Sequence, residues 1–265
     1  MSHSLFDLTG KRAFITGATK GIGRAIAEAF ADHGTVMVLT SRHGTEAQAA
    51  AEEINQRVGR GAAIGIESDL LRLDRLIASY DEALAHFGQI DVLVCNAAAT
   101  SSIFGSAQDF STAEYTELMQ ANIVNNVALM NHAATGMRER CDGVILVTSS
   151  ASGVRPSYGV FPYGVAKAGL NHAVRCLAGE LAPFNVRVNG VAPGLTRSWS
   201  LEQSMKEDAQ VIDRFRQGIP LRRIIQPEEI AAGMVFLASE GGKAMTGQII
   251  VMDGGEPGPG VMPGV

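Results

Sequence analysis

The sequence predicts a single-domain α/β protein with a doubly wound, mostly parallel sheet of about seven strands and helices on both faces. Short, near-continuously apolar runs alternate with longer amphipathic stretches along the chain. Strands buried on both faces of a parallel sheet are expected to be apolar throughout rather than alternating. The 265 residues, 46% of them hydrophobic, are enough for one full core, and neither an internal repeat nor a composition shift is present. Residues 1–265 are therefore expected to form one domain.

The expected strands and helices follow one another in a regular order. The apolar runs predict strands at 12–16, 35–40, 62–67, 91–95, 143–149, 186–192 and 247–252. The stretches between them predict helices at 22–33, 45–58, 71–87, 111–139, 162–182, 201–217 and 227–239. Ser111 and Glu114 have the spacing of a capping box at the start of the fourth helix. Pro227, followed by two glutamates, suits the first turn of the last helix.

Composition and charge argue against several classes of partner. The formal net charge is −5 and the basic residues form no stripe, so nucleic acid is not expected to bind. The N-terminal segment lacks a signal-peptide pattern, and no apolar run approaches the roughly 20 residues that cross a bilayer. We therefore expect a cytoplasmic protein with no membrane partner. The three cysteines are far apart and are interpreted as free buried thiols, and the scattered histidines predict no metal site.

A glycine-rich turn lies between the first expected strand and the first expected helix. In "TGATKGIG" (16–23), Gly17, Gly21 and Gly23 provide backbone without Cβ atoms, so that amides at the helix N-terminus can approach a pyrophosphate. Such a turn is a weak signal alone, but the strand before it and the helix after it are the context that supports a nucleotide site. A structural turn without a ligand is the alternative.

At this turn the chain resembles the short-chain dehydrogenase/reductase family, and the resemblance covers nearly all of it. The matching motifs are "TGATKGIG" (16–23), "SDL" (68–70), "CNAA" (95–98), Asn122, Ser150, "YGVAK" (163–167), "VNGVAPG" (188–194) and "TGQIIVMDGG" (246–255). The resemblance implies a Rossmann-type fold, a nicotinamide cofactor, and hydride transfer to or from a small-molecule carbonyl or alcohol. It also implies a homodimer or homotetramer. The cofactor-binding residues that it implies are Gly17, Thr19, Lys20, Gly21, Ile22, Gly23, Ser41, Arg42, Asp69, Leu70, Asn96, Ala97, Ala98, Tyr163, Lys167, Pro193, Gly194 and Thr196.

The end of the second expected strand favours NADP(H) over NAD(H). An NAD site of this kind typically has a carboxylate there to bind the ribose hydroxyls. This chain has Ser41 followed by Arg42, and no acid occurs from Gly34 until Glu46. A guanidinium suits a 2′-phosphate, which it can bind through two hydrogen bonds, and Lys20 could add a second cation as in NADP-dependent relatives. The alternative for Arg42 is a solvated surface charge.

Four residues match the family's catalytic set. Tyr163 and Lys167 are four positions apart and share a helix face, where an ammonium and an oxidised nicotinamide would favour the phenolate. Ser150 ends the fifth expected strand, thirteen positions before Tyr163, and its hydroxyl could bind the substrate oxygen. Asn122 resembles the family asparagine that anchors a water next to the lysine. Each residue alone could be structural, but the four in order favour the catalytic interpretation.

Some positions depart from the family pattern, and others bear on the substrate. Cys95 and Ala98 replace the first Asn and the Gly of the usual N-N-A-G, and both Thr196 and Ser198 could provide the hydroxyl near the carboxamide. Residues 195–220 are expected to form a substrate lid, and 254–265 a Gly/Pro-rich tail outside any helix or central strand. The candidate substrate residues are Ser152, Tyr158, Phe161 and Trp199. The alternatives are reduction of a C=C or C=N bond and a non-enzymatic NADP-binding regulator. Enoyl reductases of related fold space Tyr and Lys more widely.

Overall fold

A computed structural model describes residues 5–99, 108–197, 201, 209–256 and 260–261. Its centre is a seven-stranded sheet in the order β3-β2-β1-β4-β5-β7-β8, and every neighbouring pair is parallel. The predicted doubly wound α/β fold is confirmed. The strands are β1 (Arg12–Ile15), β2 (Val36–Ser41), β3 (Ala63–Glu67), β4 (Val92–Cys95), β5 (Gly143–Thr148), β7 (Val186–Pro193) and β8 (Ile249–Met252).

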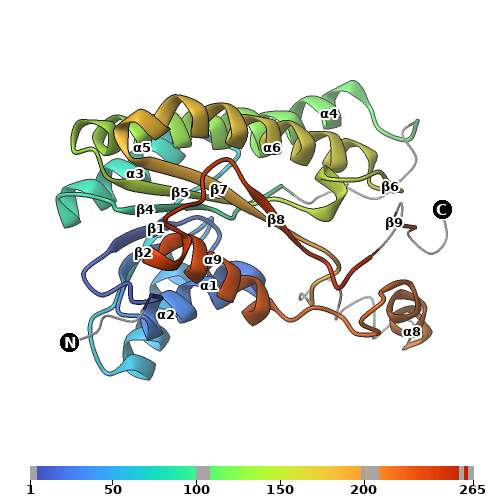
Figure 1. The fold of residues 1–265 in the computed structure, drawn as a ribbon, viewed down its shortest axis with the longest axis horizontal. Helices are drawn as coiled ribbons and strands as arrows, with labels where there is room; N and C mark the ends of the chain where they lie inside the picture. Colours follow the sequence, from blue (N-terminus) through green and yellow to red (C-terminus); the bar gives the residue numbers. More distant parts are fainter. Residues whose placement is uncertain (1–4, 100–107, 198–200, 202–208, 257–259, 262–265) are drawn as a thin grey trace.

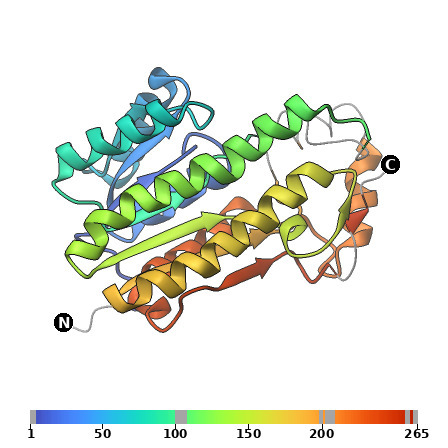
Figure 2. The same ribbon diagram turned by 90° about the horizontal axis from the view of Figure 1, so that it is seen from above.

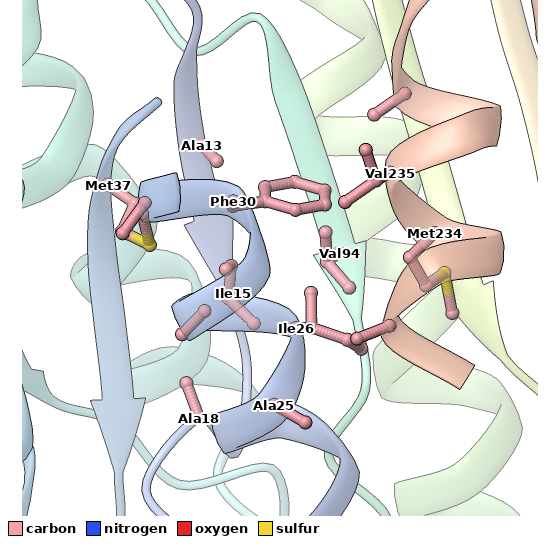
Figure 3. Packing of buried hydrophobic residues seen from close by; sticks show 14 of the residues in the cluster. Ala13, Ile15, Ala18, Ala25, Ile26, Phe30, Met37, Val94, Met234 and Val235 are labelled. Carbon is pink, nitrogen blue, oxygen red and sulfur yellow. The ribbon is translucent and has the colours of Figure 1, made fainter. Parts of the chain in front are cut away.

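Helices cover both faces of the sheet (Figures 1 and 2). One face carries α1 (Gly21–Asp32), α2 (Gly44–Val58) and α9 (Pro227–Ala238), and the other carries α3 (Leu73–Phe87), α5 (Asn126–Glu139) and α6 (Phe161–Leu181). Side chains alternate along β1, so that Ala13 and Ile15 belong to one core cluster and Phe14 to the other. Figure 3 shows the first cluster, where Phe30 of α1 and Val235 of α9 pack together over the sheet.

The predicted fourth helix changes its winding near the middle. It begins at the predicted capping box, in which Ser111 and Glu114 bond reciprocally, and runs as α4 (Thr112–Met119). A π-helical segment, Gln120–Asn125, then joins α4 to α5. A wider turn cannot be read from apolar periodicity, because it adds only one residue to an otherwise helical pattern. Such π-helical turns are frequent at functional sites, and this one contains Asn122.

The chain between β5 and α6 pairs with the C-terminal part of the protein. A short 3₁₀ turn, Ala151–Gly153, leads to strand β6 (Ser157–Tyr158), which pairs in parallel with β9 (Gly260–Val261). Part of the predicted tail therefore forms a peripheral strand outside the central sheet. Helix α8 (Ala209–Gly218) lies at the same end of the molecule (Figure 1), within the predicted lid. Residues 202–208 of the predicted helix lie outside the described part.

The interpretation of all three cysteines as buried was wrong. Cys95 is buried at the end of β4, but Cys141 and Cys176 are exposed and all three are free thiols. Cys141 follows α5 with a positive φ of 51°, and Cys176 lies on the outer side of α6, so neither side chain reaches the core. Among the described residues, we find no helix with the length and apolar character to span a bilayer.

Candidate active site

The glycine-rich turn forms an open cradle at the N-terminus of α1. Gly17 and Gly21 have φ values of 63° and 56°, which favour glycine. A Cβ on Gly23 would lie 2.1 Å from the carbonyl oxygen of Gly17, so this position admits no side chain. Open space surrounds Gly21, and α1 starts with neither a side-chain cap nor an acidic residue in its first turn. Amides left without a side-chain acceptor next to open space fit an anionic pyrophosphate.

Asn96 fastens this cradle to the sheet. Its Nδ2 donates to the carbonyl oxygens of Thr16 (3.1 Å) and Gly17 (3.0 Å), and its Oδ1 accepts from Oγ1 of Thr148 (3.0 Å). The Thr16 hydroxyl in turn accepts from the backbone amides of Asn96 and Ala97, both at 2.9 Å. The Asn96 side chain is thus engaged with protein groups, and its contribution to the cradle is to hold the turn in place.

A buried lysine lies next to Tyr163 on α6. Lys167 is 2% exposed, its Nζ donates to the carbonyl oxygen of Thr148 (2.8 Å), and Nζ lies 5.5 Å from the centroid of the Tyr163 ring. The Tyr163 side chain is half-buried and the Ser150 hydroxyl interacts with it. The structure therefore brings Ser150, Tyr163 and Lys167 together at the carboxyl end of β5, where ligands of such sheets bind.

Asn171 holds the two flanks of Ser150 in place, and sequence reasoning missed it. Its Oδ1 accepts from the Ser149 hydroxyl (2.5 Å), and its Nδ2 donates to the carbonyl oxygen of Gly153 (3.0 Å). Asn171 is four residues after Lys167 and eight after Tyr163, so all three share one stripe of α6. That helical spacing was the available signal.

Burial shifts the pKa values of the titratable groups at the end of β5. Removal from water raises the pKa of Tyr163 to about 12, and its hydrogen bond with Ser150 opposes the rise. The same loss of hydration lowers the pKa of Lys167 to about 8. It also raises the pKa of the buried Cys95 thiol to about 12, so this neighbour is uncharged at neutral pH. The polypeptide thus keeps Tyr163 as a neutral phenol, able to donate a proton, beside a lysine that titrates just above neutral pH.

Asn122 anchors the segment that follows β4. It is fully buried, its Oδ1 accepts from the backbone amide of Ala99, and its Nδ2 donates to the carbonyl oxygen of Ala99, both at 3.0 Å. The π-helical segment packs against α6, since a Cβ on Gly169 would lie 2.8 Å from Cδ1 of Ile123. Asn126 donates to the backbone carbonyl of Asn122 at 3.3 Å.

A carboxylate reaches the place where the sequence predicts a 2′-phosphate. Oε1 of Glu46 lies 3.2 Å from Nζ of Lys20, and Oε2 accepts from the Ser41 hydroxyl at 3.3 Å. The hydrogen bond from Lys20 lowers the pKa of Glu46, so the carboxylate is ionised at neutral pH. Arg42 is exposed and has no hydrogen bond or ion pair within the described part of the chain. In the sequence, Glu46 is only the first acidic residue after Gly34, too far along the chain to belong to the end of β2. In the structure, the first turn of α2 places its carboxylate beside Ser41 at the end of β2.

Comparison with known proteins identifies the family. A family model described as enoyl-(acyl carrier protein) reductase matches residues 17–256. The chain is 34% identical over 249 residues to the 3-oxoacyl-[acyl-carrier-protein] reductase FabG of Aquifex aeolicus, covering 94% of this chain and 98% of the relative. This chain belongs to the short-chain dehydrogenase/reductase family.

Solved structures of other short-chain dehydrogenases/reductases have the same fold. A 7α-hydroxysteroid dehydrogenase in complex with NADH and 7-oxo glycochenodeoxycholic acid has a TM-score of 0.89 at 32% identity, over 99% of both chains. The L-sorbose reductase of Gluconobacter frateurii in complex with NADPH and L-sorbose has a TM-score of 0.88 at 28% identity, over 96% of this chain and 99% of that one. Because one of these structures contains NADH and the other NADPH, similarity of the overall fold does not distinguish NAD(H) from NADP(H) as the cofactor.

The remaining candidate residues of this short-chain dehydrogenase/reductase lie around the same edge. Asp69 and the buried Leu70 follow β3, and Thr196 donates to the carbonyl oxygen of Gly194 (3.1 Å) beyond Pro193 at the end of β7. The other predicted positions divide by exposure: Thr19, Ile22, Ala97, Ala98 and Ser152 are half-buried, while Tyr158 and Phe161 are 58% and 49% exposed. The Phe161 ring contacts Tyr115 of α4, 6.3 Å between centroids. Ser198 and Trp199 lie outside the described residues.

Proposed function

We propose that this protein is an NADP(H)-dependent oxidoreductase that transfers hydride between the nicotinamide and a small-molecule carbonyl or secondary alcohol. The observation that carries this proposal is the corner at the end of β5, where buried Lys167 lies beside Tyr163 and Ser150, next to the open glycine cradle. Family membership supports a nicotinamide cofactor, because solved relatives hold NADH or NADPH.

The residues divide into a cofactor side and a reacting side. The cradle of Gly17, Gly21 and Gly23 would bind the pyrophosphate, and Lys20, Ser41 and Arg42 the 2′-phosphate. Asp69 and Leu70 would lie at the adenine, and Ala97, Ala98, Pro193, Gly194 and Thr196 at the nicotinamide end. When bound, NADP(H) supplies or accepts the hydride.

On the reacting side, this chain supplies a proton and holds the substrate oxygen. The Ser150 hydroxyl would donate a hydrogen bond to the carbonyl oxygen, and the neutral phenol of Tyr163 would donate its proton to that oxygen as reduction proceeds. The Lys167 ammonium, held by the Thr148 carbonyl, would stabilise the phenolate that remains. Asn122 would keep the π-helical segment positioned against this corner.

Reduction of a carbonyl is favoured over reduction of C=C or C=N. The matching family model is described as an enoyl reductase, yet FabG and L-sorbose reductase have names that denote carbonyl reduction, and the solved steroid dehydrogenase holds a 7-oxo compound. Tyr163 and Lys167 keep the four-residue spacing that related enoyl reductases widen. Reduction as the physiological direction, a cytoplasmic location and a homo-oligomer stay predictions.

An NADPH-oxidation screen tests this proposal. The compounds are 3-oxoacyl thioesters, steroid ketones, ketoses, aldehydes and quinones, with enoyl thioesters and imines as the rival class. We expect turnover with at least one carbonyl compound. Tyr163→Phe should abolish it, because the proton donor is lost, while NADPH still binds in a fluorescence titration. Turnover confined to the enoyl or imine compounds, or activity retained by Tyr163→Phe, would contradict the mechanism.

A further inference from the structure

We propose that Glu46 is a specificity-determining residue that opposes the 2′-phosphate of NADP(H). It holds the preference for NADP(H) over NAD(H) below the level that Lys20, Ser41 and Arg42 would give without it. This assignment rests on the proposed function, since it requires the adenosine ribose to lie at the end of β2.

The carboxylate of Glu46 engages two of the groups that a 2′-phosphate would use. One oxygen binds Lys20 in the glycine turn (3.2 Å), and the other accepts from Ser41 at the end of β2 (3.3 Å). A phosphate has the same charge sign and the same need for hydrogen-bond donors, so the two anions compete for Lys20 and Ser41. The contact is accessible to a ligand, because the Lys20 and Glu46 side chains are 68% and 39% exposed.

The backbone that carries Glu46 cannot readily withdraw. The first turn of α2 lies against β3 so closely that a Cβ on Gly65 would be 2.2 Å from the carbonyl carbon of Ala47. At the start of the same helix, the amide of Gly44 donates to Oε2 of Glu67 (3.3 Å). The ion pair can therefore break only by rotation of the Lys20 or Glu46 side chain, and the charge of Glu46 stays close to the end of β2.

The two cofactors meet this carboxylate differently. A 2′-phosphate brings a second negative charge close to Glu46, and it must break the ion pair between Glu46 and Lys20 to bind Lys20 itself. Both the repulsion and the lost ion pair reduce the electrostatic free energy gained on binding. A 2′-hydroxyl carries no charge and can donate a hydrogen bond to the carboxylate while Lys20 keeps its partner. Glu46 is thus a repulsive element against one ligand and an acceptor for the other, whereas the exposed Arg42 favours the phosphate.

Two probes that differ only in the 2′-phosphate test this role: adenosine 2′,5′-bisphosphate and 5′-AMP. Their dissociation constants are measured by calorimetry on the full-length protein and on Glu46→Gln, which keeps the size of the side chain. We expect the preference for the bisphosphate to rise about fivefold in Glu46→Gln, the scale of one exposed ionic interaction. The rise should shrink at high ionic strength, because salt screens exposed charges.

Glu53→Gln is the matched control. Glu53 lies seven residues later on α2 and pairs with Arg24 at 2.9 Å, also with an exposed carboxylate. Its substitution should leave the preference unchanged. An unchanged or reduced preference in Glu46→Gln, or an equal rise in Glu53→Gln, would overturn the role of Glu46.

Arg42→Ala separates this inference from the proposed function. If the wild-type protein favours 5′-AMP and Arg42→Ala does not alter that, the assignment of NADP(H) fails. The effect of Glu46→Gln still reports on Glu46 in that case, because removing a carboxylate beside the ribose should raise relative affinity for the phosphorylated probe whichever cofactor wild type prefers.

Discussion

Replacing Arg155 with Met should remove the clamp that holds the segment between Ser150 and Tyr163 to the C-terminal part of the chain. Nη1 of Arg155 lies 2.5 Å from Oδ2 of Asp253, and Nη2 lies 2.7 Å from Oε2 of Glu256. The side chains of Arg155, Asp253 and Glu256 are 18%, 10% and 24% exposed. Strand β6 begins two residues after Arg155 and pairs with β9, so the ion pairs and this strand pairing both join the segment before Tyr163 to the C-terminal part of the chain.

The magnitude follows from burial. Removing one member of a buried ion pair costs about 3–5 kcal/mol, because the remaining charge is left without compensation. Here two carboxylates lose their shared cation, but all three side chains keep some contact with water, so we expect the lower end, about 3 kcal/mol. A fully exposed pair would cost no more than about 1 kcal/mol.

The assay is urea denaturation of wild type and Arg155→Met at one fixed protein concentration, since association would otherwise change the apparent stability. Lys243→Met is the control, because Lys243 pairs with Glu240 at 2.9 Å while both side chains are about two-thirds exposed or more. Arg155→Lys should recover part of the loss by keeping one ion pair. The contrary result is that Arg155→Met lowers the free energy of unfolding by less than about 1 kcal/mol, which is no more than Lys243→Met is expected to lose. That result would refute the larger contribution that burial predicts for the Arg155 ion pairs.

Two further predictions follow from burial and from close packing. In the folded protein Lys167 has a pKa of about 8, so between pH 8 and 10 it is mostly deprotonated, whereas in the unfolded chain it is still protonated. Because the unfolded chain binds the extra proton, raising the pH over this range should increase the free energy of unfolding. Urea denaturation at both pH values should show wild type gaining up to about 2 kcal/mol relative to Lys167→Met, and an equal pH response in the two proteins would show that Lys167 titrates normally. Gly23→Ala should abolish NADPH binding in a fluorescence titration, because its Cβ would lie 2.1 Å from the Gly17 carbonyl oxygen. Gly179→Ala is the control: Gly179 lies on α6 with open space around it, so this substitution should leave NADPH binding intact and raise the free energy of unfolding by up to about 1 kcal/mol. Normal NADPH binding by Gly23→Ala would contradict the role of the glycine-rich turn in binding the cofactor.

Local patterns along the chain were sufficient to predict the fold. Buried parallel strands are apolar throughout and their crossover helices are amphipathic, so element order and type follow from short windows of sequence. The same holds for the capping box of Ser111 and Glu114, and for the shared helix face of Tyr163 and Lys167, because both depend on neighbours three or four residues apart.

Only the tertiary structure decided how these residues are held and charged. Arg155 meets Asp253 across 98 positions, Lys167 meets Thr148 across 19, and Glu46 reaches Lys20 across 26. No local window contains such pairs. The pKa values of Tyr163 and Lys167 likewise depend on every element that removes water from the corner, which a spacing of four residues cannot express. Sequence by itself determined which groups this protein has for its chemistry, while packing decided which of them are buried, paired or free to meet a ligand, because desolvation and charge pairing arise only between segments brought together by the fold.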